Sequence, residues 1–319
     1  MPGANDQIPA PTRAAAGAAQ PASPFFSLVI PAYNAESTLA ETLDSVLAQT
    51  FPDFEAIVVN DGSLDRTHEI AASYAERDPR IRVVDQGNGG TGSAYNTGVR
   101  HARAEWVMML SADDLITPEH MATYHAALTE RGAQSWAAEP GAVGIVTSGG
   151  VFLYEDGTTE PFYPELPWAG PDGVTLAELI ERCFIAVGAA YPRALWEAIG
   201  GFKEDLYAED YLFFLEILAR GYRHLYLPEP LAVHRRHRAQ KSANGLLMRR
   251  QDREIVSRLA AAYALAPADA AAAHATIARL TANIERRTRL YAIFGASRSE
   301  RLLSLAHRVR TSLKQMVGR

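Results

Sequence analysis

Apolar residues recur along the first part of the chain in four short runs, and each run ends in a polar or glycine-rich segment. The first three runs are followed by helical spacing; after the first, Leu39, Leu43 and Val46 fall on one face. Strands that alternate with helices of this size predict βαβ units, and so a Rossmann-like, mostly parallel central sheet flanked by helices. The predicted strands are Phe26–Ile30, Ala56–Val59, Ile81–Val84 and Trp106–Leu110.

Polar residues follow each predicted strand, and in a parallel sheet they meet at one edge, where ligands bind. There Tyr33 offers an aromatic face to a nucleobase, and Asp61 offers an acceptor for a base N–H such as the uracil imide. Around Gly90 the chain is rich in glycine, so its backbone can approach a ligand closely, although it lacks both the Walker lysine spacing and a dinucleotide fingerprint. Each feature also has a structural alternative: core packing for Tyr33, a plain turn for Asp61-Gly62, and a tight loop for the glycines.

The fourth predicted strand runs directly into two adjacent carboxylates, Asp113 and Asp114. Two such groups repel each other and lose hydration, and a bound Mg²⁺ or Mn²⁺ is the usual reason to tolerate them, because these ions favour oxygen ligands. The alternative is a helix start, in which Asp114 or Thr117 caps a helix that opens at Pro118. The pair alone does not separate a metal site from a helix cap.

Several of these segments together resemble the successive signatures of family 2 glycosyltransferases, which have the GT-A fold. They are Pro31-Ala32-Tyr33-Asn34, Val59 to Thr67, Asn88-Gly89-Gly90 through Asn96-Thr97-Gly98, and Ala112-Asp113-Asp114. The resemblance resumes at Ile199-Gly200-Gly201-Phe202, at Glu209-Asp210, at Pro230-Leu231, and at Arg236 and Arg238. It implies a hexosyl- or N-acetylhexosaminyltransferase that takes its sugar from a nucleotide-sugar donor, a UDP-sugar by family habit, with inversion at the anomeric carbon. It also implies a divalent metal and a role in bacterial cell-surface polysaccharide or glycoconjugate synthesis.

The resemblance assigns roles to single residues. Asp113 is its main metal ligand and Asp114 a second, which holds the loop or a metal-bound water. Its nucleotide-binding residues are Pro31, Ala32, Tyr33, Asn34, Glu36, Asp61, Gly90, Ser111, Ala112 and Asp113.

A helix predicted downstream carries Glu209 and Asp210 at its beginning, where carboxylates also suit the helix dipole. Sugar transfer needs a base within hydrogen-bond reach of the attacking hydroxyl. By resemblance Asp210 is this base, and Glu209 orients the acceptor. Positive charge develops on the sugar and negative charge on the leaving diphosphate, which the metal stabilises, so no protein acid is required.

Two positions depart from the family pattern. Ser111 stands where the metal motif usually has a carboxylate that contacts the ribose, so the local charge is one unit less negative. Tyr95 stands just before Asn96, where family members often have an arginine, so a cationic contact to the nucleotide is missing. These departures bear on donor identity and metal affinity rather than on the fold.

The segment from Val233 to Ser242 is dense in cations. Guanidinium groups bind phosphate oxygens, and family members use a comparable stretch as a lid on the diphosphate, which also excludes water. The best matches are Arg236, His237 and Ser242, and His237 is also within reach of a metal by this alignment. The alternative is a solvated basic linker.

Charge is unevenly distributed along the chain: residues 241–319 hold 15 Lys and Arg against 5 Asp and Glu, while the whole chain carries −6. Two apolar stripes at helical spacing run through this basic part, and they favour either an interfacial helix on the cytoplasmic leaflet or a helical hairpin packed on the domain or on a second subunit. The stripes are Ile277, Leu280, Ile284, Tyr291 and Phe294, then Leu302, Leu305, Val309, Leu313 and Met316. The predicted domains are a disordered Ala- and Pro-rich tail (1–24), a GT-A domain (25–240) and a helical extension (241–319).

Composition fits this interpretation, because 48% hydrophobic and 21% charged residues are normal for a globular protein. The single cysteine, Cys183, allows no internal disulfide and suits a reducing compartment, and no signal peptide or membrane span is evident. We therefore expect a cytoplasmic enzyme, at most peripheral at the inner face of the membrane, with a glycan, lipid-linked or protein acceptor and no nucleic acid partner. Two other functions remain open, a catalytically silent nucleotide-sugar binding module and a nucleotidyltransferase, although the latter would normally have a basic glycine-rich loop after the first strand.

Overall fold

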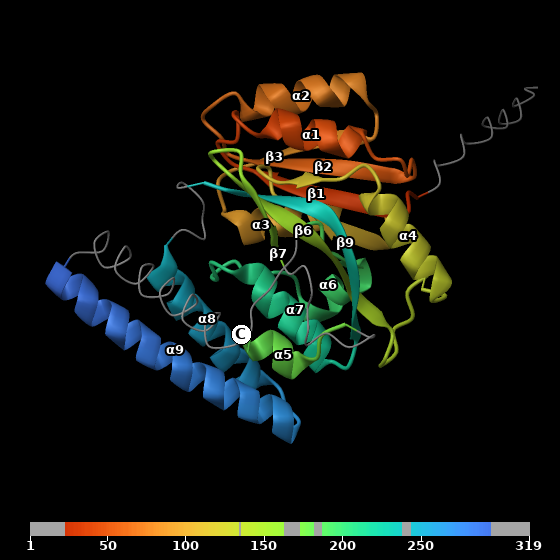
Figure 1. Ribbon diagram of the computed structural model, residues 1–319. Helices are drawn as coiled ribbons and strands as arrows, with labels where there is room; N and C mark the ends of the chain where they lie inside the picture. The colour runs from red at the N-terminus through yellow and green to blue at the C-terminus, as the bar shows by residue number, and fades with distance from the viewer. Residues whose placement is uncertain (1–22, 134, 163–172, 182–186, 238–243, 295–319) are drawn as a thin grey trace, which may run out of the picture.

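The computed structural model describes residues 23–133, 135–162, 173–181, 187–237 and 244–294 (Figure 1). Several predictions lie outside these residues: most of the N-terminal tail, Cys183, Arg238, Ser242 and the second C-terminal stripe. The described residues form one nine-stranded sheet in the order β3-β2-β1-β4-β8-β6-β9-β5, with β7 on β6. The strands are β1 (Phe26–Ala32), β2 (Phe54–Asp61), β3 (Ile81–Gln86), β4 (Trp106–Met109), β5 (Leu115–Ile116), β6 (Val143–Tyr154), β7 (Thr159–Phe162), β8 (Ala190–Pro192) and β9 (Arg223–Arg236).

The four predicted strands form the parallel part of the sheet. Strand β1 lies between β2 and β4, and Phe26 is opposite both Phe54 and Trp106. Strand β3 adds to the outer side of β2, also in parallel. The carboxyl ends of these strands therefore share one edge of the sheet, as the sequence predicted, and the loops that follow them meet there.

The remaining strands make the sheet mixed. Strand β8 pairs antiparallel with both β4 and β6, and β9 runs parallel to β6. The short strand β5 pairs antiparallel with β9, so that Leu115 lies opposite Val233. This pairing brings the end of β9 beside the residue that follows Asp113 and Asp114.

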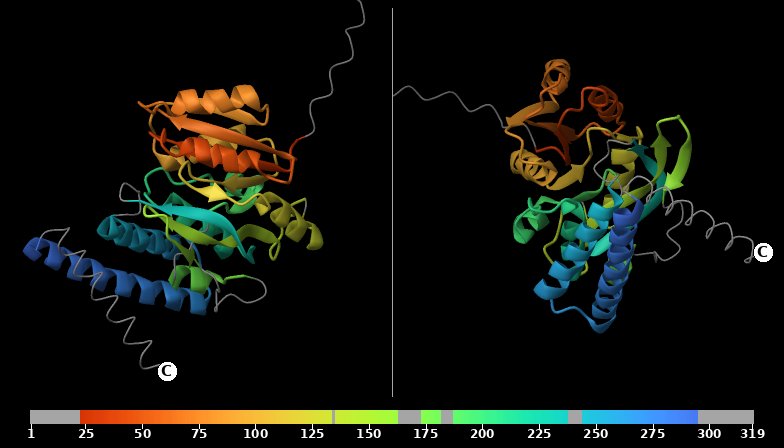
Figure 2. Two further views of the ribbon diagram at one scale, coloured as in Figure 1. Left: turned by 45° about the horizontal axis from the view of Figure 1, so that its top comes forward. Right: turned by 90° about the vertical axis from the view of Figure 1, so that its left-hand side faces the viewer.

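Helices cover both faces of the sheet (Figures 1 and 2). Alternate residues of β1 face opposite sides: Leu28 and Ile30 pack with α1, α2 and α4, whereas Val29 packs with α3, α5, α6 and α7. The helices are α1 (Leu39–Leu47), α2 (Thr67–Arg77), α3 (Thr91–His101), α4 (His120–Glu130), α5 (Leu176–Glu181), α6 (Arg193–Ile199), α7 (Glu209–Ala219), α8 (Gly245–Ala262) and α9 (Pro267–Phe294).

Helices α8 and α9 lie side by side against the α5–α7 side of the molecule in both figures. Ile255, Val256 and Leu259 of α8 are fully buried in the same core as α7, and Leu280 of α9 is also buried. The described part of the extension is thus a hairpin packed on the domain, the second of the two alternatives. In the described part of the chain, none of the helices combines the length and the apolar character that crossing a bilayer requires.

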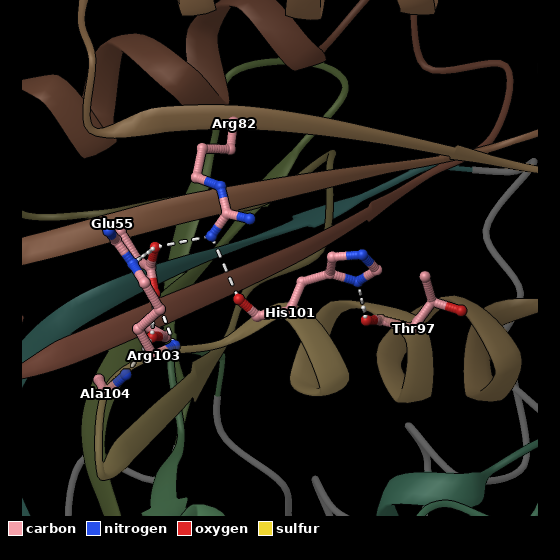
Figure 3. Close-up of polar contacts among 7 residues, drawn as sticks. Glu55, Arg82, Thr97, His101, Arg103 and Ala104 are labelled. Carbon is pink, nitrogen blue, oxygen red and sulfur yellow. Dashed lines mark hydrogen bonds and ion pairs between the residues drawn. The ribbon is translucent and has the colours of Figure 1, made fainter. Parts of the chain in front are cut away.

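A buried charge fixes the opposite edge of the sheet, where the parallel strands begin (Figure 3). Glu55 of β2 is 1% exposed, and its carboxylate accepts hydrogen bonds from Ser27 Oγ (2.7 Å), Arg82 Nη1 (3.0 Å), and the backbone N–H (2.8 Å) and Nε (2.9 Å) of Arg103. Burial raises the pKa of Glu55, but these donors outweigh it and hold the pKa below its ordinary value. The cluster therefore stabilises the strand starts, far from the loops that follow the carboxyl ends.

Candidate active site

The loops after β1 and β2 are joined by reciprocal hydrogen bonds. Asn34, which has a left-handed φ of 49°, donates its backbone N–H to Ser63 Oγ (3.1 Å) and accepts at Oδ1 from the N–H of Leu64 (2.9 Å). Glu36 likewise donates its N–H to Asp65 (3.0 Å) and accepts from the N–H of Arg66 (3.3 Å). Asn34 and Glu36 thus hold the two loops together at the ends of their strands.

Tyr33 lies at the solvent-facing side of this joined pair of loops. It directly follows Pro31 and Ala32, the last residues of β1, and is 50% exposed. Core packing, the structural alternative for this residue, is therefore wrong. Its ring is available to a planar ligand.

Asp61 organises the glycine-rich segment. Its side chain is buried, and its Oδ1 accepts from Gln86 Nε2 (2.7 Å) and the N–H of Gly89 (2.8 Å), while Oδ2 accepts from the N–H of Gly90 (2.9 Å). Gly62 follows with a φ of 70°, and a Cβ there would lie 2.8 Å from the backbone nitrogen of Asn88. The side chain of Asp61 therefore sets the position of the N-terminus of α3. The plain-turn alternative for Asp61-Gly62 does not account for this role.

The two carboxylates after β4 have different surroundings. Asp113 is 30% exposed and its Oδ2 lies 3.0 Å from Nε2 of His237, which follows β9. Asp114 is 2% exposed; its Oδ1 accepts from the N–H of Arg235 (3.0 Å), and its Oδ2 lies 3.3 Å from Nδ1 of His234. Burial raises the pKa of Asp114, the His234 contact opposes this, and Asp113 adds to it. The carboxylate of Asp114 thus holds the loop against β9. Asp113 and His237 are the more exposed pair and are accessible to a ligand.

The helix-cap alternative for this loop is wrong. Helix α4 begins at His120, and its N-cap residue Glu119 makes no side-chain cap hydrogen bond. The carboxylate of Asp114 instead accepts a hydrogen bond from β9, and no described residue bonds the hydroxyl of Thr117. Two backbone carbonyls of the loop also accept hydrogen bonds. The carbonyl of Ser111 accepts one from the N–H of Asp114 (3.1 Å), and the carbonyl of the buried Ala112 accepts one from the hydroxyl of Thr42 (3.0 Å).

Tyr95 of α3 connects the two halves of the chain. It is 5% exposed; burial raises its pKa well above the ordinary value, and the carboxylates of Glu209 and Asp210 raise it further, with a smaller opposing hydrogen bond from Ser111. A Cβ on Gly92, at the start of the same helix, would lie 3.4 Å from Cγ of Glu209. The residues after β4 and those at the start of α7 therefore meet at α3. From the sequence, Tyr95 was notable only because it replaces the arginine that family members often have at this position.

Asn96 attaches α3 to the segment before α7, a role that the sequence did not reveal. Its amide nitrogen donates to the carbonyl of Phe202 (3.0 Å) and to Glu204 (2.9 Å), and its Oδ1 accepts from Trp196 Nε1 (3.0 Å) and the N–H of Phe202 (2.8 Å). Gly201 leaves room for this, because a Cβ there would lie 2.8 Å from that oxygen. The Asn96-Thr97-Gly98 and Ile199-Gly200-Gly201-Phe202 segments were the available signal, but only their pairing gives it meaning.

The predicted catalytic carboxylates lie in the first turn of α7. Glu209 is buried, and Asp210 is half-buried beside Tyr95. The preceding loop is tied to α8, since Tyr207 donates its N–H to Gln251 Oε1 (3.0 Å). At the end of β9, Arg236 stacks on the ring of Phe152 at 4.4 Å. The structure thus brings Asp61, Asp114, Ser111, Glu209 and Asp210 around α3.

An open cavity of about 510 Å³ lies between α3 and the 200–205 loop. Asn96, Arg100 and Trp196 line it, together with residues of the 200–205 loop. None of Asp61, Asp113 and Asp210 does so. The described residues of the predicted site therefore do not line this cavity.

Comparison with known proteins assigns a family to part of the chain. Residues 27–139 match the family model described as Glycosyl transferase family 2. This segment belongs to glycosyl transferase family 2. The family 2 segment is 48% identical over 94 residues to the uncharacterized glycosyltransferase EpsJ of Bacillus subtilis, which is 30% of this chain and 27% of that protein. It is 36% identical to the glycosyltransferase GlyA of Streptococcus pneumoniae over 104 residues. This stretch covers 33% of this chain and 15% of GlyA. The match thus spans about a quarter or less of the length of these two curated relatives.

Two solved structures resemble the chain over most of its length. TarS of S. aureus (residues 1–349), solved with UDP-GlcNAc, has a TM-score of 0.63 at 22% identity and covers 84% of this chain and 75% of its own. The mannosyltransferase PcManGT of Pyrobaculum calidifontis, solved with GDP-Man and Mn²⁺, has a TM-score of 0.58 at 22% identity and covers 90% and 80%. At this identity the likeness shows the fold, and it confirms the predicted GT-A architecture of family 2.

Proposed function

We propose that this chain is a metal-dependent, inverting glycosyltransferase that moves a sugar from a nucleotide-sugar donor to an acceptor hydroxyl. The observation that carries the proposal is the position of α3. Its Gly92 lies against the side chain of Glu209, and its Tyr95 is near enough to Ser111, Asp114 and Asp210 to interact with them. A donor-binding loop and a candidate base therefore face the same helix. That juxtaposition is what a displacement between a bound donor and an acceptor needs.

The donor end is formed by the loops after β1, β2 and β4. The exposed ring of Tyr33 stacks on the nucleobase, held in place by the Asn34 and Glu36 hydrogen bonds. Asp61 Oδ2 accepts one hydrogen bond from the residues that the structure describes, and its remaining lone pair is offered to a base N–H such as the uracil imide. Ser111 hydrogen-bonds the ribose in place of the carboxylate that the family usually has. UDP is therefore the first nucleotide to test.

The metal site in this proposal consists of Asp113 and His237. Among the described residues, no group of three or more His, Cys, Asp and Glu side chains could hold an ion. A pair of neighbouring donors nevertheless fits an ion that takes its other ligands from substrate phosphates, as Mg²⁺ usually does. When bound, the ion stabilises the negative charge of the leaving diphosphate. Asp114 keeps the loop in place for it.

Asp210 acts as the base that accepts the proton of the acceptor hydroxyl, and the neighbouring Glu209 orients the acceptor. Arg236 and His237 reach the diphosphate from the end of β9 and, with Ser242, exclude water that would hydrolyse the donor. The proposal also includes a cytoplasmic location and a role in cell-surface polysaccharide or glycoconjugate synthesis. The acceptor in this proposal is a glycan, a lipid-linked molecule or a protein. This last part rests on the family resemblance alone.

The experiment is a panel of nucleotide sugars screened by thermal unfolding with Mn²⁺, with Mg²⁺ and with EDTA, followed by an assay of nucleoside diphosphate release. Ligand binding raises the apparent stability, so the true donor gives a metal-dependent rise in Tm. Asp210→Asn should keep this rise but lose turnover by about 100-fold or more. Asp113→Asn should lose the metal dependence, and Asp156→Asn, in the exposed β6–β7 turn, should behave as wild type.

The silent binding module remains a second candidate because Ser111 lacks the carboxylate that the family usually has. It predicts that the wild-type protein gains stability with a nucleotide sugar but releases no nucleoside diphosphate with any acceptor. Metal-dependent release that Asp210→Asn abolishes would exclude it.

A further inference from the structure

The cavity of about 510 Å³ between α3 and the 200–205 loop is not used by the chemistry proposed above. Its volume lies within the range of small-molecule sites. Asn96 and Arg100, one turn apart, line it from α3, and Trp196 lines it from α6. These walls are tied to one another, because Asn96 accepts a hydrogen bond from Trp196 Nε1 (3.0 Å) and donates one to Glu204 (2.9 Å). The cavity is therefore a preformed feature of the fold.

The cavity lies beside the start of α7, where the candidate base is found. Gly92 of α3 packs against both places: a Cβ on it would lie 3.5 Å from Cα of Glu204, which lines the cavity, and 3.4 Å from Cγ of Glu209. Asn96 and Arg100 follow Gly92 by about 6 Å and about 12 Å along the helix axis. The cavity therefore begins next to the Glu209-Asp210 pair and extends away from it along α3.

The charges of the cavity select the class of ligand. Among the described residues, the charged side chains that line it have mixed signs: Arg100, Glu197, Lys203, Glu204 and Asp205. Three carboxylates would repel an anionic group, two basic groups would repel a cationic one, and an apolar ligand would remove water from all five at a cost in free energy. A neutral ligand with many hydroxyls can donate to the carboxylates and accept from the basic groups.

The indole of Trp196 completes this selection. It is partly exposed, and its N–H is already bonded to Asn96. The ring face that remains is apolar and carries the negative part of the aromatic quadrupole, which suits the C–H face of a sugar ring. An aromatic face surrounded by polar side chains therefore fits a saccharide better than it fits a phosphate, a metal ion or a lipid chain.

We propose that this cavity binds sugar units of an oligosaccharide acceptor, beyond the unit whose hydroxyl is deprotonated by Asp210; this rests on the proposed function. The acceptor then runs from the start of α7 along α3 and over Trp196. An acceptor of several units gains contacts that a single sugar does not make, so affinity rises with chain length. A cavity that holds solvent only predicts no such dependence.

The test is titration calorimetry with tetrasaccharides of glucose, galactose, mannose and N-acetylglucosamine, each compared with the methyl glycoside of its own unit. In the wild-type protein at least one tetrasaccharide should bind about 10-fold tighter than its single sugar, or better. The same tetrasaccharide should accelerate nucleoside diphosphate release from the selected donor more than the single sugar does.

Two variants remove different parts of the cavity wall. Trp196→Leu removes the aromatic face, and Arg100→Gln removes a charged donor while leaving the hydrogen bonds of Asn96 in place. Each should lower tetrasaccharide affinity by about 10-fold, change single-sugar affinity by less than about twofold, and keep the rise in Tm that the donor gives. Arg250→Gln, at an exposed position of α8 outside the cavity, is the matched control and should behave as wild type.

The outcomes separate this inference from the proposed function. Tetrasaccharides that bind no tighter than single sugars, or an advantage that persists in both variants, would overturn the role of the cavity while donor binding and release stay intact. A tetrasaccharide that binds in the cavity but never accelerates release would overturn its role toward the acceptor. A wild-type protein that no nucleotide sugar stabilises, and that releases no nucleoside diphosphate, would refute the proposed function, whereas calorimetry still reports on the cavity.

Discussion

Two buried carboxylates show how the surroundings of a single residue decide its effect on stability. Glu55 is surrounded by donors from three other residues, and its pKa lies below the ordinary value despite burial. Asp252 of α8 is also buried, but within the described part of the chain its ion pair is the 3.6 Å contact with Arg249, and burial raises its pKa to about 6. Burial alone does not decide the sign; the number of hydrogen bonds to the charged form does. The difference could not be predicted from the sequence, because the donors to Glu55 come from Ser27, Arg82 and Arg103, which are distant in the chain, and the burial of Asp252 depends on how α8 packs.

The two carboxylates should therefore affect stability with opposite signs. Glu55 stabilises the fold above its unfolded pKa, and this contribution is lost as the pH falls through its lowered folded pKa. Asp252 destabilises the fold above its folded pKa of about 6, and this cost disappears as the pH falls toward its unfolded pKa near 4. At pH 7.5 we expect Glu55→Gln to lower, and Asp252→Asn to raise, the free energy of unfolding by about 2 kcal/mol each.

Urea denaturation of both variants at several pH values measures this. The advantage of Asp252→Asn should shrink between pH 6 and pH 4, whereas the deficit of Glu55→Gln should shrink only below about pH 4. Glu76→Gln, at an exposed position of α2, serves as the control and should differ little from wild type throughout. Equal signs for the two variants at pH 7.5 would contradict the argument.

At the scale of elements, α3 determines how much of the site the sequence could predict. Its existence followed from the helical spacing after the glycine-rich segment, and the four parallel strands followed from their continuous apolar runs. Its role as the meeting point of Asp61, Ser111 and Asp210 did not, because that depends on packing between segments far apart in the chain. Strand β8 has only three residues, and β9 contains two prolines and several charges, so neither has a clear strand pattern. Strands β8 and β9 were therefore not predicted, whereas the apolar run from Val143 to Tyr154 did predict β6.

The close packing of α3 on β1 gives a test at this scale. A Cβ on Gly98 would lie 2.2 Å from Cγ1 of Val29, and that valine is fully buried in the core. Gly98→Ala should push α3 off the sheet and lower the free energy of unfolding by about 1–3 kcal/mol. It should also weaken donor-induced stabilisation, because the N–H groups that bond Asp61 lie at the N-terminal end of the same helix.

Gly87→Ala is the matched control for this prediction. A Cβ there would meet nothing within 4 Å, so the same substitution should leave both stability and donor binding close to wild type. Thermal unfolding with and without the selected nucleotide sugar measures both properties. Loss of donor binding in Gly87→Ala, with Gly98→Ala unaffected, would contradict the role given to α3.

At the scale of the whole molecule, the described C-terminal helices belong to the same core as the family 2 segment. Leu259 of α8 and Ala273 of α9 are fully buried in one cluster with Val29 of β1, which belongs to that segment, and with Leu215 of α7. The basic charge of this region suggested a membrane helix, and the narrow stripes with the Ala-rich sequence around residues 260–278 favoured a packed hairpin, because amphipathic spacing alone does not reveal which surface covers an apolar stripe. The structure answers that question for residues 244–294. A shared core of this kind predicts that the extension and the domain unfold together.

Tryptophan fluorescence can test this because all four tryptophans, Trp106, Trp136, Trp168 and Trp196, precede the extension. Leu259→Ala should create a cavity in α8 and lower the free energy of unfolding by about 2–5 kcal/mol. If the core is shared, the transition followed by tryptophan fluorescence should shift as far as the one followed by far-UV circular dichroism. Arg250→Ala, at an exposed position of the same helix, should shift neither. A fluorescence transition that stays in place while the helical signal melts earlier would show that the extension folds separately.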